Sequence, residues 1–152
     1  MGKKKLNFRD FKNVVRNTPL ISIDLIIENN TKKVLLGKRT NRPARDFWFV
    51  PGGRIFKDES LEDAFNRIVE AEIGIEKSIT DAKFVGVYQH FYNDNFSEDE
   101  FSTHYIVLAY KLFIDDDERT FPLEQHSDYK WLEIDLAKKD PLVHKFTKDY
   151  FV

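Results

Sequence analysis

Short runs of apolar, aromatic and β-branched residues, separated by polar turn residues, fill the middle of the chain and are typical of β-strands. The first two runs, 20–28 and 33–39, flank the turn residues Asn29, Asn30 and Thr31, which favours a hairpin. Two longer runs, rich in aromatic and β-branched residues, surround the polar segment NDNFSEDE and predict a long antiparallel pair. The longer runs are 83–92 and 103–114, and shorter apolar runs lie at 47–50 and 129–132.

Segments whose apolar residues recur at helical spacing precede, separate and follow these strands. A short amphipathic helix is predicted over 7–17, and Pro19 stops it because proline lacks a backbone donor. A longer helix is predicted over 61–73, and one or two closing helices, broken at Pro141, are expected over 133–150. Helices before, between and after the strands predict an α+β fold with a mixed sheet.

The helix over 61–73 carries clear signals at both of its ends. Ser60 is suited to the N-cap, and Asp63 is placed for the reciprocal contact of a capping box. Gly74 suits the left-handed conformation in which many helices end. The capping residues therefore predict the same boundaries as the apolar periodicity.

One carboxylate interrupts the apolar face of this helix. At 100° per residue, Glu72 falls on the face that points to the core, whereas Glu70 points to the opposite side. A buried carboxylate is costly unless it is paired or bound to a metal. Glu72 is therefore expected either to hold a metal ion or, more plainly, to bond Arg67 or a loop amide. The apolar residues of this face are Leu61, Phe65 and Ile68.

Composition and charge exclude several classes of protein. The 152 residues are 41% hydrophobic and 14% aromatic, which excludes disorder and fits a single domain over 1–152. The absence of cysteine excludes disulfides and cysteine-built zinc sites. The chain has no apolar run long enough for a membrane helix, and MGKKKLNF lacks the apolar stretch of a secretory signal. With a net charge of −2, a soluble cytoplasmic protein without nucleic-acid or membrane partners is expected.

Residues 52–75, GGRIFKDESLEDAFNRIVEAEIGI, resemble a Nudix box. That box reads Gly, five residues, Glu, seven residues, Arg-Glu, an aliphatic residue, any residue, Glu-Glu, any residue, Gly and an aliphatic residue. Two of its glutamates are missing here, because Ile68 follows Arg67 and Ala71 precedes Glu72. The resemblance implies a Nudix fold, in which helices flank a mixed β-sheet as an α/β/α sandwich. The matching positions are Gly53, Glu59, Arg67, Val69, Glu72, Gly74 and Ile75.

The two missing glutamates bear on the mechanism that the box supports. In ordinary Nudix pyrophosphohydrolases these carboxylates help to hold several metal ions, and water attacks phosphorus. Their loss fits either a dead enzyme or a different mechanism that uses fewer metals. The departures resemble one Nudix subgroup, the GDP-mannose mannosyl hydrolases. The likeness is carried by VVRNTPLISID (14–24), LLGKRTNRPARDFWFVPGGR (35–54), YQHFYNDNF (88–96), THYIVL (103–108) and EQHSDYKWL (124–132).

Resemblance to this subgroup implies a homodimeric enzyme that hydrolyses GDP-mannose, and also GDP-glucose, to GDP and free hexose. Water attacks the anomeric carbon with inversion, so the C–O bond breaks instead of a P–O bond. The transition state carries positive charge on the sugar, and negative charge grows on the departing β-phosphate. The resemblance also implies a Mg²⁺ cofactor, for which Mn²⁺ can substitute. The implied metal ligands are Glu72, the side-chain oxygen of Gln125 and the backbone carbonyl of Gly52.

The resemblance further assigns five residues to catalysis. His126, which adjoins the glutamine ligand, is implied as the general base that takes a proton from water. Arg39 and Arg54 are the implied leaving-group arginines, because planar guanidinium forks match phosphate oxygens. Asp24, an acid in an almost fully apolar strand, is implied to stabilise the cationic sugar, in part through Arg39. Tyr105 either donates its hydroxyl to a leaving oxygen or is a plain core aromatic.

The sequence says least about which residues bind the substrate without taking part in the reaction. His90 is the histidine, apart from the proposed base, that is most expected to touch the sugar. Phe11 is expected to stack on guanine, with Leu6 flanking the base, and Arg39 also counts as substrate-binding. Phe8 and Phe11 lie one helical turn apart, so the alternative is that both are core residues.

Two other functions stay open on the sequence alone. An ordinary Nudix pyrophosphatase would release GMP and a sugar 1-phosphate, with Glu59 or Glu70 replacing the missing carboxylates. A non-catalytic Nudix module would bind a nucleotide sugar without turning it over, although such a module has no need of a base. Product identity separates the two enzymes, and metal-dependent turnover separates an enzyme from a binding module.

Overall fold

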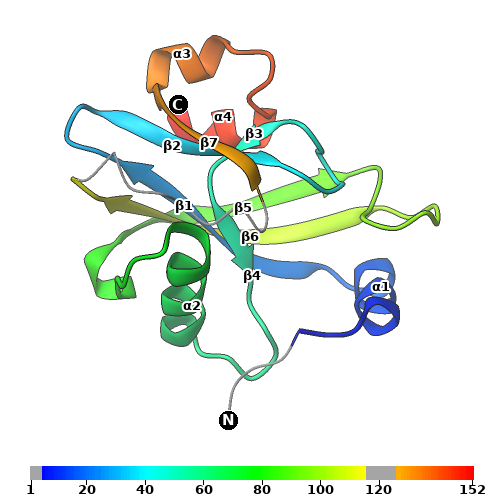
Figure 1. Cartoon of the computed structure of the whole chain (residues 1–152). Helices are drawn as coiled ribbons and strands as arrows, with labels where there is room; N and C mark the ends of the chain where they lie inside the picture. The colour runs from blue at the N-terminus through cyan, green and yellow to red at the C-terminus, as the bar shows by residue number, and fades with distance from the viewer. Residues whose placement is uncertain (1–4, 116–125) are drawn as a thin grey trace.

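The computed structural model describes residues 5–115 and 126–152 of the chain. Figure 1 shows the sheet in the middle of the molecule, with α2 on one side and α3 and α4 on the other. In the described part of the chain, no helix is long and apolar enough to cross a membrane. The elements are α1 Phe8–Asn17, β1 Leu20–Glu28, β2 Lys33–Arg39, β3 Trp48–Phe49, β4 Gly52–Arg54, α2 Leu61–Ile73, η1 Ile79–Asp81, β5 Lys83–Tyr92, β6 Thr103–Phe113, β7 His126–Glu133, α3 Ile134–Lys139, α4 Lys145–Lys148 and η2 Asp149–Phe151.

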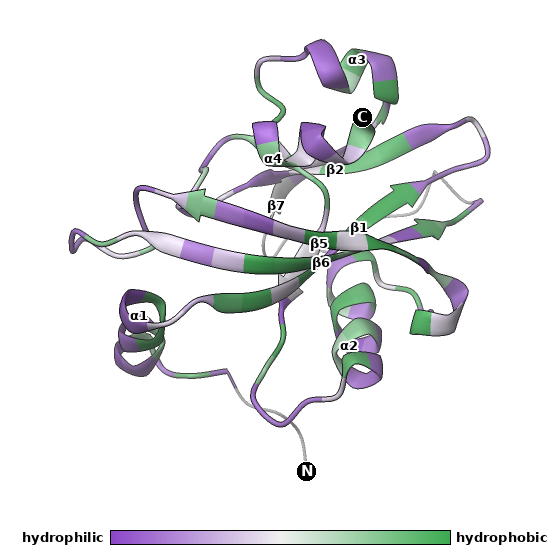
Figure 2. Ribbon diagram, turned by 180° about the vertical axis from the view of Figure 1, so that it is seen from behind, coloured by the Kyte–Doolittle hydropathy of each residue, from purple (hydrophilic) through white to green (hydrophobic). Residues whose placement is uncertain are grey.

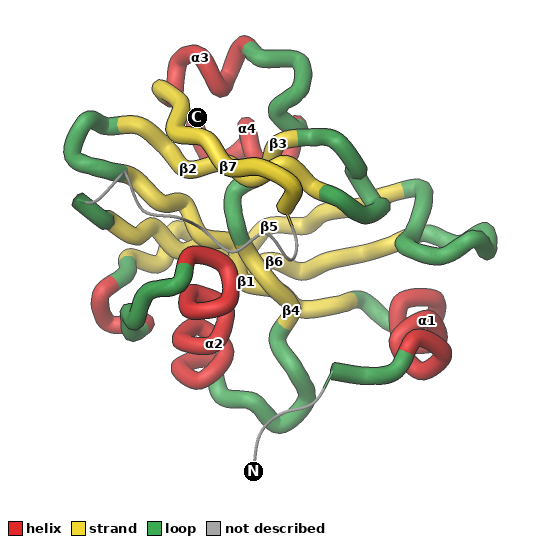
Figure 3. The backbone as a smooth tube through the Cα atoms, viewed as in Figure 1, coloured by secondary structure: helices red, strands yellow, loops and turns green. Residues whose placement is uncertain are grey.

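The strands form one mixed sheet in the order β3-β2-β1-β6-β5, with β4 paired to β1 and β7 paired to β2. Strand β1 runs parallel to β6, from Leu20 opposite Tyr105 to Glu28 opposite Phe113. The other pairings among the described strands are antiparallel, and β5 and β6 form the predicted hairpin. The tube drawing in Figure 3 shows how β1 lies at the centre of this sheet. The predicted mixed sheet is therefore confirmed.

Alternate side chains of the central strands supply two cores, one on each face of the sheet. Ile23, Leu25 and Ile27 of β1 pack with Phe65 of α2, and all four side chains are fully buried. Ile26 belongs to a second cluster, to which the C-terminal segment contributes. Two cores separated by one sheet produce the α/β/α sandwich that the sequence predicts. The second cluster is Ile26, Val34, Leu36, Trp48, Val50, Ala109, Ala137, Val143 and Phe151.

The ends of α2 agree with the predicted capping residues in most respects. The Ser60 side chain accepts a hydrogen bond from the Asp63 amide at 3.1 Å, and Gly74 adopts a φ of 71°. Among the described hydrogen bonds, the Asp63 side chain returns none to the Ser60 amide, so the capping box is only half formed. Leu61 is 41% exposed, because the buried residues of the helix begin at Ala64, one turn later.

Two strands depart from the prediction because long-range pairing determines them. Strand β7 starts at His126, whereas the sequence predicts a start at residue 129, because β7 pairs with β2 as far as Arg39 opposite His126. Strand β4 is not predicted, since its two glycines have little β propensity. It forms because Gly52 pairs with Asp24 of β1 in an antiparallel ladder.

Candidate active site

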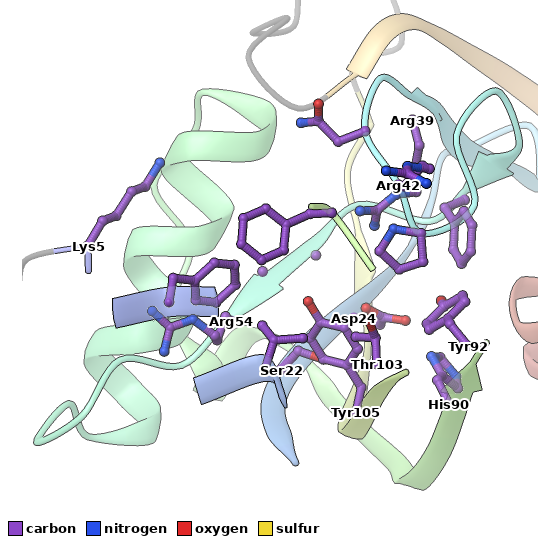
Figure 4. Close-up of a pocket in the computed structure, with 18 of the residues that line it drawn as sticks. Lys5, Ser22, Asp24, Arg39, Arg42, Arg54, His90, Tyr92, Thr103 and Tyr105 are labelled. Atoms are coloured by element: carbon purple, nitrogen blue, oxygen red, sulfur yellow. The ribbon is translucent and has the colours of Figure 1, made fainter. Parts of the chain in front are cut away.

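A cleft of about 550 Å³ opens between α1, the β2–β3 loop, β4 and the β5–β6 hairpin. Figure 4 shows Arg54 on one side of this cleft and Asp24, Tyr92 and His90 on the other. The structure describes nine of the predicted site residues with their side chains, and all nine line the cleft. They are Leu6, Phe11, Asp24, Arg39, Gly52, Arg54, Glu72, His90 and Tyr105.

Two predicted site residues cannot be placed in the same way. Gln125 lies outside the described residues, so the predicted amide ligand stays a prediction. For His126 the structure describes the backbone, which lies opposite Arg39 in the pairing of β7 with β2. Arg39 is the last residue of β2 and lines the cleft. The register therefore brings the backbone of His126 close to the cleft.

Glu72 presents a buried carboxylate to the cleft from α2, with 4% of its surface exposed. Its Oε1 accepts a hydrogen bond from the Gly52 amide at 3.1 Å, so the expected bond to a backbone amide is confirmed. A Cβ on Gly52 would lie 2.5 Å from Asp24 Oδ1 and 2.5 Å from the Ile23 carbonyl oxygen. Glycine at this position therefore allows β4 to approach β1 closely and brings Glu72, Gly52 and Asp24 together.

In the described part of the chain, Arg67 bonds Glu59, and no described hydrogen bond or ion pair joins it to Glu72. Its Nε lies 2.7 Å from Glu59 Oε2, and its Nη2 donates to Glu59 Oε1 at 3.0 Å and to the Arg54 carbonyl at 2.7 Å. Glu59 Oε1 also accepts from the Phe56 amide at 2.9 Å. Both oxygens of Glu59 are thus used to fasten the segment between β4 and α2, beneath the cleft.

Arg54 and Arg39 both line the cleft, and neither forms a salt bridge with a carboxylate of the described residues. The Arg54 guanidinium lies between two aromatic rings, 5.0 Å from the centroids of Phe11 and of Phe56. The Arg39 guanidinium lies 5.5 Å from the Phe49 centroid, and its Nε is buried with no hydrogen-bond partner in the described chain. Both cations are therefore available to an anionic ligand.

Asp24 lies at the opposite end of the cleft from Arg54 and is held by a residue from the C-terminus. The Tyr150 hydroxyl donates to Asp24 Oδ2 at 2.5 Å, and it lies 3.5 Å from His90 Nε2. Burial raises the pKa of Asp24 to about 6, although the Tyr150 hydrogen bond and the Arg39 charge both act to lower it. With a pKa near 6, Asp24 is mostly ionised at pH 7, and its interactions with nearby charges are stronger because it is removed from water.

His90 is a buried, uncharged group at the same end. Its side chain is 4% exposed, and its ring stacks on Phe146 with a centroid distance of 4.4 Å. Burial first, and then the neighbouring His144, lowers the pKa of His90 to about 4. A neutral imidazole has one donor and one acceptor nitrogen, which suits contact with a hydroxyl group.

Tyr105 lies between the two ends, on β6. Burial raises the pKa of its phenol above the usual value, while the nearby charges of Arg39 and Arg54 act to lower it. The hydroxyl therefore stays protonated and can donate a hydrogen bond in the part of the cleft that both arginines face. Tyr105 thus lines the cleft, and its role in the reaction stays a prediction.

Several residues of the site have no signal in the local sequence. Tyr150 contacts Asp24 across 126 positions of the chain, which no pattern of spacing indicates. Arg42 and Phe96 come from loops, where neither helical nor strand periodicity applies. Tyr92 follows His90 on the same face of β5, so strand alternation could have identified it.

The donor set of the cleft suits one divalent cation with few protein ligands. Among the side chains that the structure describes, no three His, Asp or Glu residues gather closely enough to hold a metal. Ile68 occupies a position where the family pattern has glutamate, and it packs against Gly53 beneath the cleft. The Glu72 carboxylate and the Gly52 backbone oxygen are hard donors of the kind that Mg²⁺ prefers.

Known structures share this fold. The MutT protein from Methanosarcina mazei Go1 superposes with a TM-score of 0.69 at 22% identity, covering 89% of this chain and 92% of that chain. The dihydroneopterin triphosphate pyrophosphohydrolase of E. coli superposes with a TM-score of 0.66 at 21% identity, covering 86% of this chain and 91% of that chain. These TM-scores show a common fold, and at this level of sequence identity the likeness is one of fold alone.

Sequence comparison identifies the family. The NUDIX domain profile matches residues 18–151. The low-salt glycan biosynthesis protein Agl8 of Haloferax volcanii is 38% identical over 137 residues, which cover 90% of this chain and 85% of that protein. An ADP-ribose pyrophosphatase of Methanocaldococcus jannaschii is 33% identical over 88 residues, which cover 57% of this chain and 50% of that protein. With its fold, its box and these matches, the chain belongs to the Nudix family.

Proposed function

We propose that this Nudix protein is an enzyme that hydrolyses GDP-hexoses, GDP-mannose and GDP-glucose among them, to GDP and free hexose. The observation that carries the proposal is the single carboxylate, Glu72, that α2 presents to the cleft. Glu59 is engaged by Arg67, and Glu70 is exposed on the opposite side of the helix, so neither replaces the missing glutamates. Attack at phosphorus with several metal ions is poorly supported by such a site.

In the proposed reaction, a water oxygen bonds to the anomeric carbon while the bond from that carbon to the β-phosphate oxygen breaks. Attack from the face opposite the leaving group inverts the configuration. The bonding electron pair departs with GDP, and the proton of the water passes to a general base. We propose His126 as that base, because of the resemblance and because the backbone register places it opposite Arg39.

The proposed leaving-group site is the part of the cleft around Arg39, Arg54 and Tyr105. Negative charge grows on the β-phosphate as GDP departs, and two guanidinium groups with no carboxylate partner among the described residues would stabilise it. The protonated phenol of Tyr105 would donate a hydrogen bond to the same phosphate. These groups act more strongly in the transition state than in the ground state, because the charge is larger there.

The proposed hexose site lies around Asp24 and His90. The ionised carboxylate of Asp24, held by Tyr150, would face the positive charge that develops on the sugar ring. The neutral imidazole of His90 would bind a sugar hydroxyl. Guanine would lie at the other end, against Phe11 and Leu6, which line the cleft beyond Arg54.

A Mg²⁺ ion completes the proposed site, and Mn²⁺ would substitute for it. Glu72, the backbone carbonyl of Gly52 and the side chain of Gln125 would hold the ion, and the residues Glu72 and Gly52 both line the cleft. When bound, the ion supplies positive charge at the diphosphate. The homodimer that the resemblance implies stays a prediction.

The printed names of the relatives bear on the choice between functions. The Haloferax relative is named for glycan biosynthesis, a process that consumes activated sugars, and this supports a nucleotide-sugar substrate. The Methanocaldococcus relative is named as an ADP-ribose pyrophosphatase, and it favours a second candidate, a pyrophosphatase that releases GMP and hexose 1-phosphate. A non-catalytic module that binds nucleotide sugars is the third alternative.

The products of the reaction distinguish these functions. With GDP-mannose and Mg²⁺, we expect GDP and free mannose in equal amounts, measured by anion-exchange chromatography and a sugar assay. GDP-glucose and GDP-fucose in parallel reactions would rank the hexoses, and ADP-ribose would test the second candidate. Release of GMP and mannose 1-phosphate would contradict the proposal, and binding without turnover would favour the non-catalytic module.

Replacing Glu72 tests the metal site. The substitution Glu72→Gln removes the one acidic ligand, so the Mg²⁺ concentration for half-maximal activity should rise at least about tenfold. Glu70→Gln is the matched control, because Glu70 lies on the exposed side of the same helix and should leave the requirement unchanged. An unaltered Mg²⁺ titration of Glu72→Gln would place the metal elsewhere.

Replacing His126 tests the general base. The substitution His126→Gln should lower kcat by about 10²- to 10⁴-fold, the range for loss of general-base catalysis, with little change in KM. His104→Gln is the control, since His104 stacks on Phe91 and does not line the cleft. Turnover of His126→Gln near the wild-type rate would exclude His126 from this role.

A further inference from the structure

Three phenylalanine rings form an aromatic cluster at the outer part of the cleft. Phe8 and Phe11 belong to α1, and Phe96 comes from the β5–β6 loop, residues 93–102. The Phe96 ring lies 5.2 Å from the Phe8 ring and 4.9 Å from the Phe11 ring, measured between centroids. Phe8 is 61% exposed, so the cluster offers apolar surface to the cleft and is not part of a closed core.

The β5–β6 loop is braced from within by Asn95, which is 2% exposed. The Asn95 amide nitrogen donates to the backbone oxygens of Asp99 and Phe101, at 2.8 and 2.7 Å. The Asn95 side-chain oxygen accepts from the Ser97 amide at 2.7 Å and from the Ser97 hydroxyl at 2.5 Å. These four hydrogen bonds brace the loop backbone around Phe96, which follows Asn95 directly, and so reduce the ordering that a ligand stacked on Phe96 would have to impose.

The same loop is fastened to both neighbouring walls of the cleft. Asp99 forms ion pairs with Lys12 and, at 3.3 Å, with Arg16, both on α1. Arg42 of the β2–β3 loop donates through Nη2 to the Ser97 carbonyl at 2.5 Å. Figure 2, seen from behind, shows α1 and the β5–β6 loop at the same end of the sheet. The aromatic cluster is therefore built by two distant segments that are tied together.

The cluster is adjacent to the cations proposed to bind phosphate. The Arg54 guanidinium lies 5.0 Å from the Phe11 centroid, and Arg39 and Tyr105 line the same cleft. A nucleoside diphosphate has this arrangement, with a flat aromatic base at one end and anionic phosphates at the other. An aromatic side chain stacks on any base, because every base has a π-face.

We propose that Phe96 is a nucleobase-binding residue, and that the β5–β6 loop is the second half of a base subsite whose first half is α1. The inference rests on the proposed function for the identity of the base, and it extends the subsite beyond Phe11 and Leu6. The ligand class is a nucleoside diphosphate, bound through its base at this cluster and through its phosphates at the arginines.

Binding measured with two probes tests this subsite. For Phe96→Ala, we expect the Kd of GDP to rise about 5- to 150-fold, the range for loss of one base–aromatic stack. The Kd of inorganic pyrophosphate should stay within about twofold of wild type, because pyrophosphate has no base. Titration calorimetry with Mg²⁺ present would measure both constants, and Phe96→Tyr should retain GDP binding.

Phe101→Ala is the matched control. Phe101 lies in the same loop, and the Arg16 guanidinium is 5.1 Å from its ring, but it does not line the cleft. We expect this variant to bind both probes as the wild type does.

The proposal would be overturned if Phe96→Ala bound GDP normally, if it lost pyrophosphate binding to the same degree, or if Phe101→Ala weakened GDP binding equally. Because no turnover is measured, these results do not depend on which bond the enzyme cleaves. A protein that releases GMP would still show the expected split between GDP and pyrophosphate.

Discussion

The geometry of the cleft depends on the contact that Gly52 makes with two neighbouring elements. Its amide donates to the Glu72 carboxylate, and its missing side chain lets β4 lie against β1 at Asp24. A Cβ at this position would lie 2.5 Å from an Asp24 carboxylate oxygen, which is closer than Cβ atoms approach other atoms in real proteins. One backbone position thereby aligns the helix carboxylate, the strand that leads to Arg54, and the acid at the far end of the cleft.

Burial then determines which of these groups carry charge. It raises the pKa of Asp24 to about 6 and lowers that of His90 to about 4, and both groups lie at one end of the cleft. The positive charges lie on Arg39 and Arg54, with a protonated Tyr105 between them. A ligand with phosphates beside a neutral sugar matches this distribution, because its charged part meets guanidinium groups and its hydroxyls meet neutral or singly charged partners.

Much of the fold is predictable from the sequence, because local signals determine it. The bounds of α2 follow from Ser60, Gly74 and the apolar spacing, and β1 and β2 follow from two apolar runs on either side of one turn. The buried carboxylate of Glu72 also follows from helix phase alone. Strand β4 and the contact of Tyr150 with Asp24 do not, because each depends on segments that only the folded chain brings together. Phe96 escapes prediction for the same reason, since it lies in a loop that the sequence marks only as polar.

In the proposed reaction, the box that lacks two glutamates directs water to carbon and not to phosphorus. Hydrolysis of GDP-mannose in ¹⁸O-water, with the label located by mass spectrometry, tests this claim most directly. If water attacks the anomeric carbon, the label appears in mannose and the released GDP carries none. Label in a phosphate of GMP or of mannose 1-phosphate would contradict it, and would mean that one helix carboxylate suffices for attack at phosphorus.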